Sequence, residues 1–453
     1  MGLKDFERRL KEALDTVPVI DPHCHMRENH PHASSLADVL LYHHVWIELV
    51  SAGMPATAVS KPGLPHELTD PQMDPADRVK ACLPYLDRIR NTASMRFLRW
   101  IFEDLYGVRG GRLTSDNWQE VSHQIERTAA DPSWGLRFLR ERCKIQGSIT
   151  VESGPRSPEA ASRPGIPQQM TRGREVRSFI TLENAKTTSL HGLRGIESGW
   201  ERAGWLKRGE ALTGDAFAEK LALQVNQLAE SDLRYIGIWV PPYLRLTDPS
   251  ANEITRVFER LRQEQDVPRE DHNAFTSFAL RRLLDAVRKT SIRTIQVIVG
   301  AEVLPPHRSL PHWDGAFVGA IGRLAGIFED LHFDVSAACD AFVHDLAILA
   351  KHVPNVSVCG YWWHALSPPL VRKSIELRLD IVPANKITAF FSDAYHAEWC
   401  YPKLRMVKQA FHDVLLERVA RGWYDEETAL SLVRPLFYEN PLRIYCGIST
   451  TPS

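Results

Sequence analysis

Short apolar runs rich in β-branched residues recur along this chain, and the later ones alternate with segments of helical periodicity. Buried, non-alternating strands separated by helices are typical of parallel β/α folds. We count eight such runs, which predicts a (β/α)8 TIM barrel. The predicted strands are 17–20, 145–151, 176–182, 234–240, 292–299, 331–335, 355–359 and 387–391.

The long segment between the first two predicted strands contains no convincing strand of its own. It predicts several helices, at 36–52, 75–89, 94–105 and 116–128. We therefore divide the chain into 1–33 (N-terminal helix and strand one), 34–142 (a helical insertion) and 143–453 (the remainder of the barrel). Two polar, glycine-rich segments, 154–173 and 192–214, predict loops at the C-terminal face of the barrel, where loops often close over a substrate.

The bulk properties favour a protein that binds neither nucleic acid nor membrane. A formal net charge of −1 gives no general attraction to polyanions, and charges interrupt every apolar run well before the roughly 20 residues that span a bilayer. The N-terminal segment lacks the apolar core of a signal peptide, and the seven cysteines form no C-x-x-C pair. We expect a cytoplasmic protein that acts on a small molecule.

The motif V-I-D-P-H-C-H at 19–25 directly follows the first apolar run. Side chains at i and i+2 of an extended segment share a face, so His23 and His25 can direct two imidazoles at one cation. Neutral imidazole suits zinc, manganese, iron or cobalt. A chance H-x-H among 18 histidines is the alternative. The position at the end of a barrel strand, where active sites lie, favours the metal.

The last predicted strand adds a third candidate ligand. Asp393 follows it in I-T-A-F-F-S-D-A-Y, where a carboxylate can bind a metal and accept a proton. Capping of the next helix is the structural alternative. His43 and His44 come early in the helix after strand one, and because adjacent helical side chains diverge by about 100°, we expect only one of them to face the site.

A tryptophan pair follows the seventh strand in V-C-G-Y-W-W-H. Trp362 and Trp363 can form a wall that packs on a sugar face or excludes water, with His364 as a polar neighbour, although burial in the core is an equal alternative. Glu183 and Glu302 follow strands three and five and are further candidate site residues, although a structural salt-bridge role is at least as plausible for both. The chain contains no P-loop, dinucleotide-binding or nucleophile-elbow motif.

Taken together, these motifs resemble those of uronate isomerases, the glucuronate isomerase branch of the amidohydrolase superfamily. The likeness runs nearly end to end. It is carried by D-P-H-C-H-M, H-H-V-W-I-E-L-V-S-A-G-M, I-Q-V-I-V-G-A, G-Y-W-W, F-F-S-D-A-Y with Y-P-K-L-R-M-V, and Y-E-N-P-L-R-I-Y.

The resemblance implies a distorted (β/α)8 barrel with a helical insertion after strand one and one divalent metal ion, with zinc first and manganese, iron or cobalt as alternatives. It implies a homo-oligomer that interconverts aldose and ketose uronic acids through an enediol. By position, His23, His25 and Asp393 match the metal ligands. His43 matches an acid–base histidine, and Trp362 or Trp363 matches the site tryptophan.

The chain departs from the family pattern at four positions. His44 stands where tyrosine is usual, Ile298 replaces a strand-five histidine, and a strand-four aspartate has no clear counterpart near Trp239. Tyr395 replaces the arginine that binds the substrate carboxylate, and tyrosine cannot provide the same bidentate clamp. Tyr395 therefore becomes a candidate substrate contact, and Arg172, Arg174 or Lys186 are candidate replacements for the arginine.

Three functions remain open at this point. The first is a metal-dependent isomerase of a uronic acid or related sugar acid, in which Asp393, His43 and His44 move protons. The second is a metal-dependent hydrolase or lyase on the same scaffold, acting by ester, lactone, amide or decarboxylation chemistry. The third is a non-catalytic ligand-binding relative, which the retention of all three candidate ligands disfavours.

Overall fold

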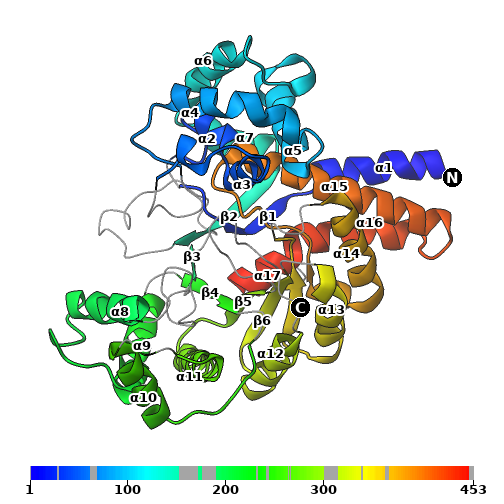
Figure 1. Cartoon of the computed structure of the whole chain (residues 1–453). Helices are drawn as coiled ribbons and strands as arrows, with labels where there is room; N and C mark the ends of the chain where they lie inside the picture. The colour runs from blue at the N-terminus through cyan, green and yellow to red at the C-terminus, as the bar shows by residue number, and fades with distance from the viewer. Residues whose placement is uncertain are drawn as a thin grey trace.

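Eight parallel strands form one sheet in the computed structural model of the chain (Figure 1). The structure describes residues 2–27, 30–61, 69–152, 172–175, 190–230, 233–240, 244–263, 265, 267–299, 315–337, 340–362 and 367–447. The strands pair in sequence order, β1-β2-β3-β4-β5-β6-β7-β8, which confirms the parallel α/β organisation. Their bounds are β1 Val19–Cys24, β2 Ile145–Glu152, β3 Arg172–Glu175, β4 Leu233–Val240, β5 Thr294–Val299, β6 His332–Ala337, β7 Val356–Cys359 and β8 Ile387–Thr388.

Helices surround this sheet. Their bounds are α1 Leu3–Thr16, α2 Leu36–Leu40, α3 His43–Ser51, α4 Pro75–Cys82, α5 Ala93–Tyr106, α6 Trp118–Ala129, α7 Trp134–Glu141, α8 Leu190–Arg202, α9 Gly214–Ala229, α10 Ala251–Arg262, α11 Arg269–Val287, α12 Ala316–Ile327, α13 Val343–His352, α14 Pro368–Ile381, α15 Ala397–Ala420, α16 Glu426–Arg434 and α17 Asn440–Cys446. Figure 1 shows α2–α7 gathered on one side of the strands, at the top of the view, and α8–α11 on the opposite side. In the described part of the chain, no helix combines the length and the apolar character that crossing a membrane requires.

The described part of 34–142 is helical, as the sequence predicts, but the predicted helix 36–52 is two helices. The break falls at Tyr42, whose backbone is extended (ψ 138°). The Tyr42 ring stacks on Trp399 at 4.4 Å, and its hydroxyl donates to the Asp393 carbonyl oxygen at 3.0 Å. These contacts hold Tyr42 toward the end of the sheet and interrupt the helix.

Local signals explain where the helices between β1 and β2 begin and end. The Thr92 hydroxyl caps α5 by accepting from the Met95 amide at 3.2 Å. The same helix ends at Gly107 in the left-handed conformation, which glycine adopts without strain. One face of α5 buries Phe97, Ile101 and neighbouring apolar residues against the rest of the chain.

The structure differs from the sequence prediction at the third strand and in the loop predicted at 192–214. The third strand is β3, Arg172–Glu175, which lies upstream of the predicted 176–182; that segment is outside the described residues. The letters R-G-R-E carry no apolar signature, so hydrophobicity favoured the run that follows. The predicted loop 192–214 instead contains most of α8, and of the predicted loop 154–173 only the part within β3 is described.

The eighth strand is also shorter than the predicted 387–391. It ends at Thr388 because the next amide, that of Ala389, donates to the Leu436 carbonyl oxygen at 2.9 Å and leaves the sheet. The chain then runs beside β1: the Asp393 amide donates to the His23 carbonyl oxygen at 2.8 Å, and the His25 amide donates to the Ala394 carbonyl oxygen at 2.8 Å. The segment after the last strand therefore lies against the first strand.

Candidate metal centre

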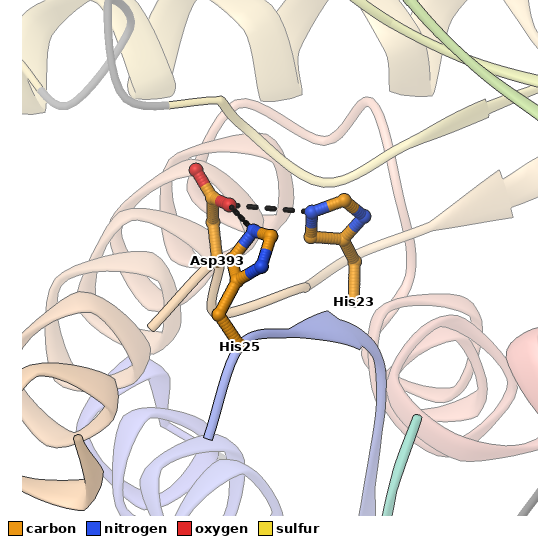
Figure 2. A group of neighbouring side chains, drawn as sticks. All are labelled: His23, His25 and Asp393. Carbon is orange, nitrogen blue, oxygen red and sulfur yellow. Dashed lines mark hydrogen bonds and ion pairs between the residues drawn. The ribbon is translucent and has the colours of Figure 1, made fainter. Parts of the chain in front are cut away.

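Three of the predicted site residues meet at this junction. Asp393 Oδ1 lies 3.2 Å from His23 Nε2 and 3.1 Å from His25 Nε2 (Figure 2). One ligand atom from each of the three lies within 4.8 Å of the others, which is close enough for all three to contact one ion. In the part of the chain that the structure describes, this is the only such group of histidine, cysteine and acidic residues.

The backbone around Asp393 explains why its carboxylate faces the two imidazoles. Asp393 has φ +54°, a left-handed conformation that aspartate adopts more readily than most residues. Hydrogen bonds to its amide and carbonyl, from β1 and Tyr42, fix this conformation. The helix-capping alternative does not apply, because α15 begins at Ala397 with His396 at its N-cap.

The carboxylate of Asp21 links the first strand to the segment that follows the last strand. Its Oδ1 accepts from the Ser392 amide at 2.8 Å and from the His23 amide at 3.4 Å. Burial raises the pKa of Asp21 to about 6, although these hydrogen bonds act in the opposite direction. Asp21 therefore positions the backbone on both sides of the candidate ligands.

Electrostatics keep Asp393 ionised. Burial alone would raise its pKa, but the hydrogen bonds and charges of His23 and His25 outweigh burial and hold the pKa well below its usual value. A buried carboxylate that stays ionised beside two imidazoles is an arrangement suited to a divalent cation.

The second nitrogen of His23 supports the same conclusion. Its Nδ1 lies 2.5 Å from Gln296 Oε1 on β5. An amide oxygen only accepts, so His23 carries a hydrogen on Nδ1, and Nε2 is the nitrogen that faces the Asp393 carboxylate, where it can hold either a proton or a metal ion. A lone pair and a carboxylate repel each other unless a cation or a proton lies between them. The donor set therefore fits a metal ion.

His43 and His44 both lie near this group, each beside a different neighbour. The two rings, whose centroids are 4.0 Å apart, are buried at the start of α3. His44 lines a cavity of about 10 Å³, the size of one water molecule, together with Asp393 and Lys403. His43 contacts Tyr395 edge to face at 5.6 Å.

Tyr395 packs directly on one candidate ligand. Its ring stacks on the His25 imidazole at 4.7 Å, with an angle of 14° between the ring planes. The resemblance predicts an arginine at this position, and in its place the chain has an aromatic ring that restricts the orientation of His25. Tyr395 thus connects the His25 ring to the His43 ring.

Trp362 forms part of an apolar cluster and is only 2% exposed. It meets Trp239 edge to face at 4.4 Å, and both belong to a cluster with Ile298, Cys359 and Phe391. The Phe391 ring lies 5.4 Å from the His23 ring, so this cluster borders the metal group. Two of the departures from the family pattern, at strands four and five, are therefore the residues that build an apolar wall.

Other predicted site residues cannot be placed. Trp363, His364, Glu183, Glu302 and Lys186 lie outside the described residues. Arg172 and Arg174 are within β3, but the structure does not describe their side chains.

Sequence reasoning missed two polar residues beside the centre. Lys403, in α15, is buried and donates from Nζ to the Ser392 carbonyl oxygen at 3.0 Å. Burial lowers its pKa to about 8, while the charges of Asp393 and Asp21 act in the opposite direction. Gln296 is the single polar amide in the strand T-I-Q-V-I-V, and its position on an otherwise apolar strand was the signal available.

Comparisons with known proteins support the resemblance. No family model matches the chain. A stretch of 159 residues is 28% identical to the uronate isomerases of Xanthomonas euvesicatoria and Xanthomonas axonopodis. This stretch covers 34% of the chain and 33% of each relative, so the match spans about a third of the length of those relatives.

Similarity of fold extends much further. The uronate isomerase of Thermotoga maritima superposes with a TM-score of 0.79 at 14% identity over 97% of both chains. The glucuronate isomerase of Caulobacter crescentus gives 0.79 at 19% identity over 99% of this chain and 95% of that one. A protein from Lactobacillus casei, described as a metal-dependent hydrolase, gives 0.56 at 14% identity over 96% and 97%. The expected resemblance to uronate isomerases is confirmed.

Proposed function

We propose that this chain is a metal-dependent enzyme that interconverts the aldose and ketose forms of a uronic acid or a related sugar acid. The observation that carries the proposal is the meeting of His23, His25 and Asp393, whose ligand atoms lie within 4.8 Å of one another. The likeness to uronate isomerases, in fold along nearly the whole chain, supports the choice of reaction.

We assign these three residues as the ligands of one divalent ion, zinc first. When bound, such an ion polarises the oxygens of the substrate and makes a hydroxyl proton easier to remove. Asp393 directs Oδ1 at both imidazoles, and Figure 2 shows its other carboxylate oxygen directed away from them. That second oxygen is the group we propose to accept the hydroxyl proton of the substrate.

Movement of the carbon-bound proton needs a second acid–base group. His43 and His44 are the candidates, because both are buried beside the centre and imidazole titrates near neutral pH. Tyr395 would position His25 and contact the substrate, and Trp362 would belong to the wall that excludes water. Arg172, Arg174 or Lys186 would bind the substrate carboxylate in place of the missing arginine.

The architecture that we propose for this chemistry is a closed, distorted (β/α)8 barrel. The backbone hydrogen bonds between Asp393 and His23 and between His25 and Ala394 support closure, since they join the two ends of the strand order. In this arrangement 34–142 is the helical insertion above the site, and 1–33 with 143–453 form the barrel.

A direct experiment tests the reaction. The protein, loaded with zinc or manganese, is incubated with D-glucuronate and with D-galacturonate in D₂O and followed by proton NMR. The proposal predicts formation of the ketose with deuterium entering next to the carbonyl, and predicts neither product nor exchange with a His25→Ala variant. An unchanged substrate spectrum, with metal confirmed in the wild-type sample, would rule out isomerisation of these uronates.

A second candidate function is metal-dependent hydrolysis or a lyase reaction. The apolar wall of Trp239, Ile298 and Trp362, and Tyr395 in place of an arginine, favour a substrate with fewer charged and hydroxyl groups than a uronate. The fold likeness to the Lactobacillus casei protein also supports it. In this reaction Asp393 would hold the proton of an attacking water. A panel of esters, lactones, amides and β-keto acids tests this alternative, and no turnover of any of them would exclude it.

A further inference from the structure

We propose that a buried hydrogen-bond chain, running from His23 through Gln296 and Tyr445 to Asp334, fixes which nitrogen of His23 is available to bind metal. The proposal rests on the metal site proposed above and deepens it. It assigns Gln296, Tyr445 and Asp334 as positioning residues, which act through His23 and do not touch the substrate.

The path is continuous and enclosed. His23 Nδ1 meets Gln296 Oε1 at 2.5 Å, and Gln296 Nε2 donates to the Tyr445 hydroxyl oxygen at 2.8 Å. The Tyr445 hydroxyl in turn donates to Asp334 Oδ2 at 2.7 Å. All four side chains are at most 2% exposed. Water therefore competes weakly for these hydrogen bonds, and each group depends on its neighbour in the chain.

The path ends at Asp334, a carboxylate that also accepts a hydrogen bond from outside the path. Asp334, on β6, receives a second hydrogen bond from the Ser357 hydroxyl of β7. Ser357 Oγ in turn lies 2.7 Å from His332 Nε2. Burial, together with the nearby charges of Arg443 and Lys386, lowers the pKa of His332 to about 4, so at neutral pH this imidazole is uncharged and can donate from Nε2.

The direction of the chain follows from the chemistry of its far end. The Tyr445 hydroxyl has a single hydrogen, and it gives that hydrogen to Asp334 Oδ2. The lone pairs of the Tyr445 oxygen then face Gln296, which has to present its amino group to them. This orientation turns Gln296 Oε1 toward His23, which must carry its hydrogen on Nδ1. Nε2, the nitrogen that faces Asp393, is left as the one that can bind the metal.

The position of Tyr445 depends on the C-terminal helix α17. The Thr294 hydroxyl of β5 donates to the Ile444 carbonyl oxygen at 2.5 Å, and the Tyr445 ring meets the Tyr235 ring edge to face at 5.0 Å. Helix α17 contacts β1, β4 and β8, and Figure 1 shows it lying against the strands near the centre of the view. The last helix of the chain thus supplies a hydroxyl that orients a ligand on the first strand.

The alternative explanation is that these side chains hydrogen-bond to one another only because they are buried, without any effect on the metal site. A purely structural chain would affect folding when broken, but it would leave metal affinity and the His23 tautomer unchanged. An orienting chain affects both. In metalloproteins, loss of the partner of a ligand histidine typically weakens metal binding by about 10- to 100-fold.

Four variants separate these possibilities. Gln296→Leu removes the partner of His23, and Tyr445→Phe removes only the hydroxyl that orients Gln296. Gln296→Glu has a carboxylate, which accepts from His23 whichever of its oxygens faces the ring. Combined with Tyr445→Phe, it should therefore restore zinc binding. Tyr106→Phe is the matched control for Tyr445→Phe, because it also removes a buried tyrosine hydroxyl that donates to a carboxylate, that of Glu398, outside the chain.

The first measurement is zinc affinity by competition with a chromophoric chelator. We expect Gln296→Leu to bind zinc about 10- to 100-fold more weakly than wild type, Tyr445→Phe to be weakened in the same direction, and Tyr106→Phe to match wild type. Wild-type affinity in both Gln296→Leu and Tyr445→Phe, with the proteins folded, would overturn the proposal.

The second measurement needs no metal. Nitrogen-15 NMR of histidine-labelled apoprotein reports the tautomer of each imidazole, and a His23→Gln variant assigns the signal. We expect the Nδ1–H form in wild type and a shift toward the Nε2–H form in Tyr445→Phe. An unchanged tautomer in that variant would refute the orienting role. If the expected tautomer shift occurs but wild type binds no zinc, the chain orients His23 and the metal proposal is the one that fails.

Discussion

The buried carboxylate of Glu398 should make this protein less stable as the pH rises toward neutrality. Glu398 is fully buried at the start of α15, where it faces α5. It accepts from the Tyr106 hydroxyl at 2.9 Å and from the Ala33 amide at 3.2 Å to each carboxylate oxygen. Burial nevertheless raises its pKa from 4.5 to about 7.

The sign and size of the effect follow from linkage. Because the folded state holds the Glu398 proton more tightly than the unfolded chain does, the contribution of Glu398 to the free energy of unfolding is highest below pH 4.5. It falls between pH 4.5 and about 7, and this contribution is constant above that range. A rise from 4.5 to about 7 corresponds to a loss of about 3 kcal/mol.

Urea unfolding from pH 4.5 to pH 8 measures this contribution. Glu398→Gln, which keeps an acceptor for Tyr106 but cannot ionise, should lack the fall and should gain stability relative to wild type as the pH rises. Glu427→Gln, at an exposed position of α16, is the matched control and should follow the wild-type profile. Parallel profiles for wild type and Glu398→Gln would refute the reasoning.

Three further predictions concern packing and the metal. Gly360→Ala should cost more than about 2 kcal/mol of unfolding free energy in urea titrations, because φ is +38° and the added Cβ would lie 2.1 Å from the Phe391 ring. Gly204→Ala, at φ +73° with nothing within 4 Å, should cost only about 1 kcal/mol, and equal costs would contradict the steric argument. Phe217→Ala should cost about 3–5 kcal/mol, since its ring contacts three phenylalanines of α10 and α11, and a loss below about 1 kcal/mol would contradict this packing. Zinc should raise the melting temperature of wild type but not of Asp393→Asn in thermal-shift assays, and an equal rise in both would place zinc elsewhere.

The sequence predicts the parallel fold and the three-residue centre for physical reasons that are visible in single segments. His23 and His25 share a face because side chains alternate along a strand, and Asp393 follows an apolar run that brings it to the same end of the sheet. The sequence does not predict β3, because its four residues are polar or glycine and it depends on pairing with β2 and β4 rather than on apolar character.

The path from His23 to Asp334 could not be predicted from the sequence. Tyr445 is 149 residues from Gln296 and 111 residues from Asp334, and no local pattern connects them. Their contact arises only when α17 packs against the sheet. The apolar wall could not be predicted from the sequence either. Trp239 and Ile298 are ordinary strand residues by sequence, and only folding brings them to Trp362.

Metal analysis of the purified protein tests the central claim most directly. After removal of metal with a chelator, reloading with zinc and desalting, elemental analysis should find about one zinc ion per wild-type chain. It should find little in Asp393→Asn or His25→Ala variants that remain folded by circular dichroism. A wild-type protein without zinc, or variants that retain as much zinc as wild type, would contradict the assignment of His23, His25 and Asp393 as a metal centre.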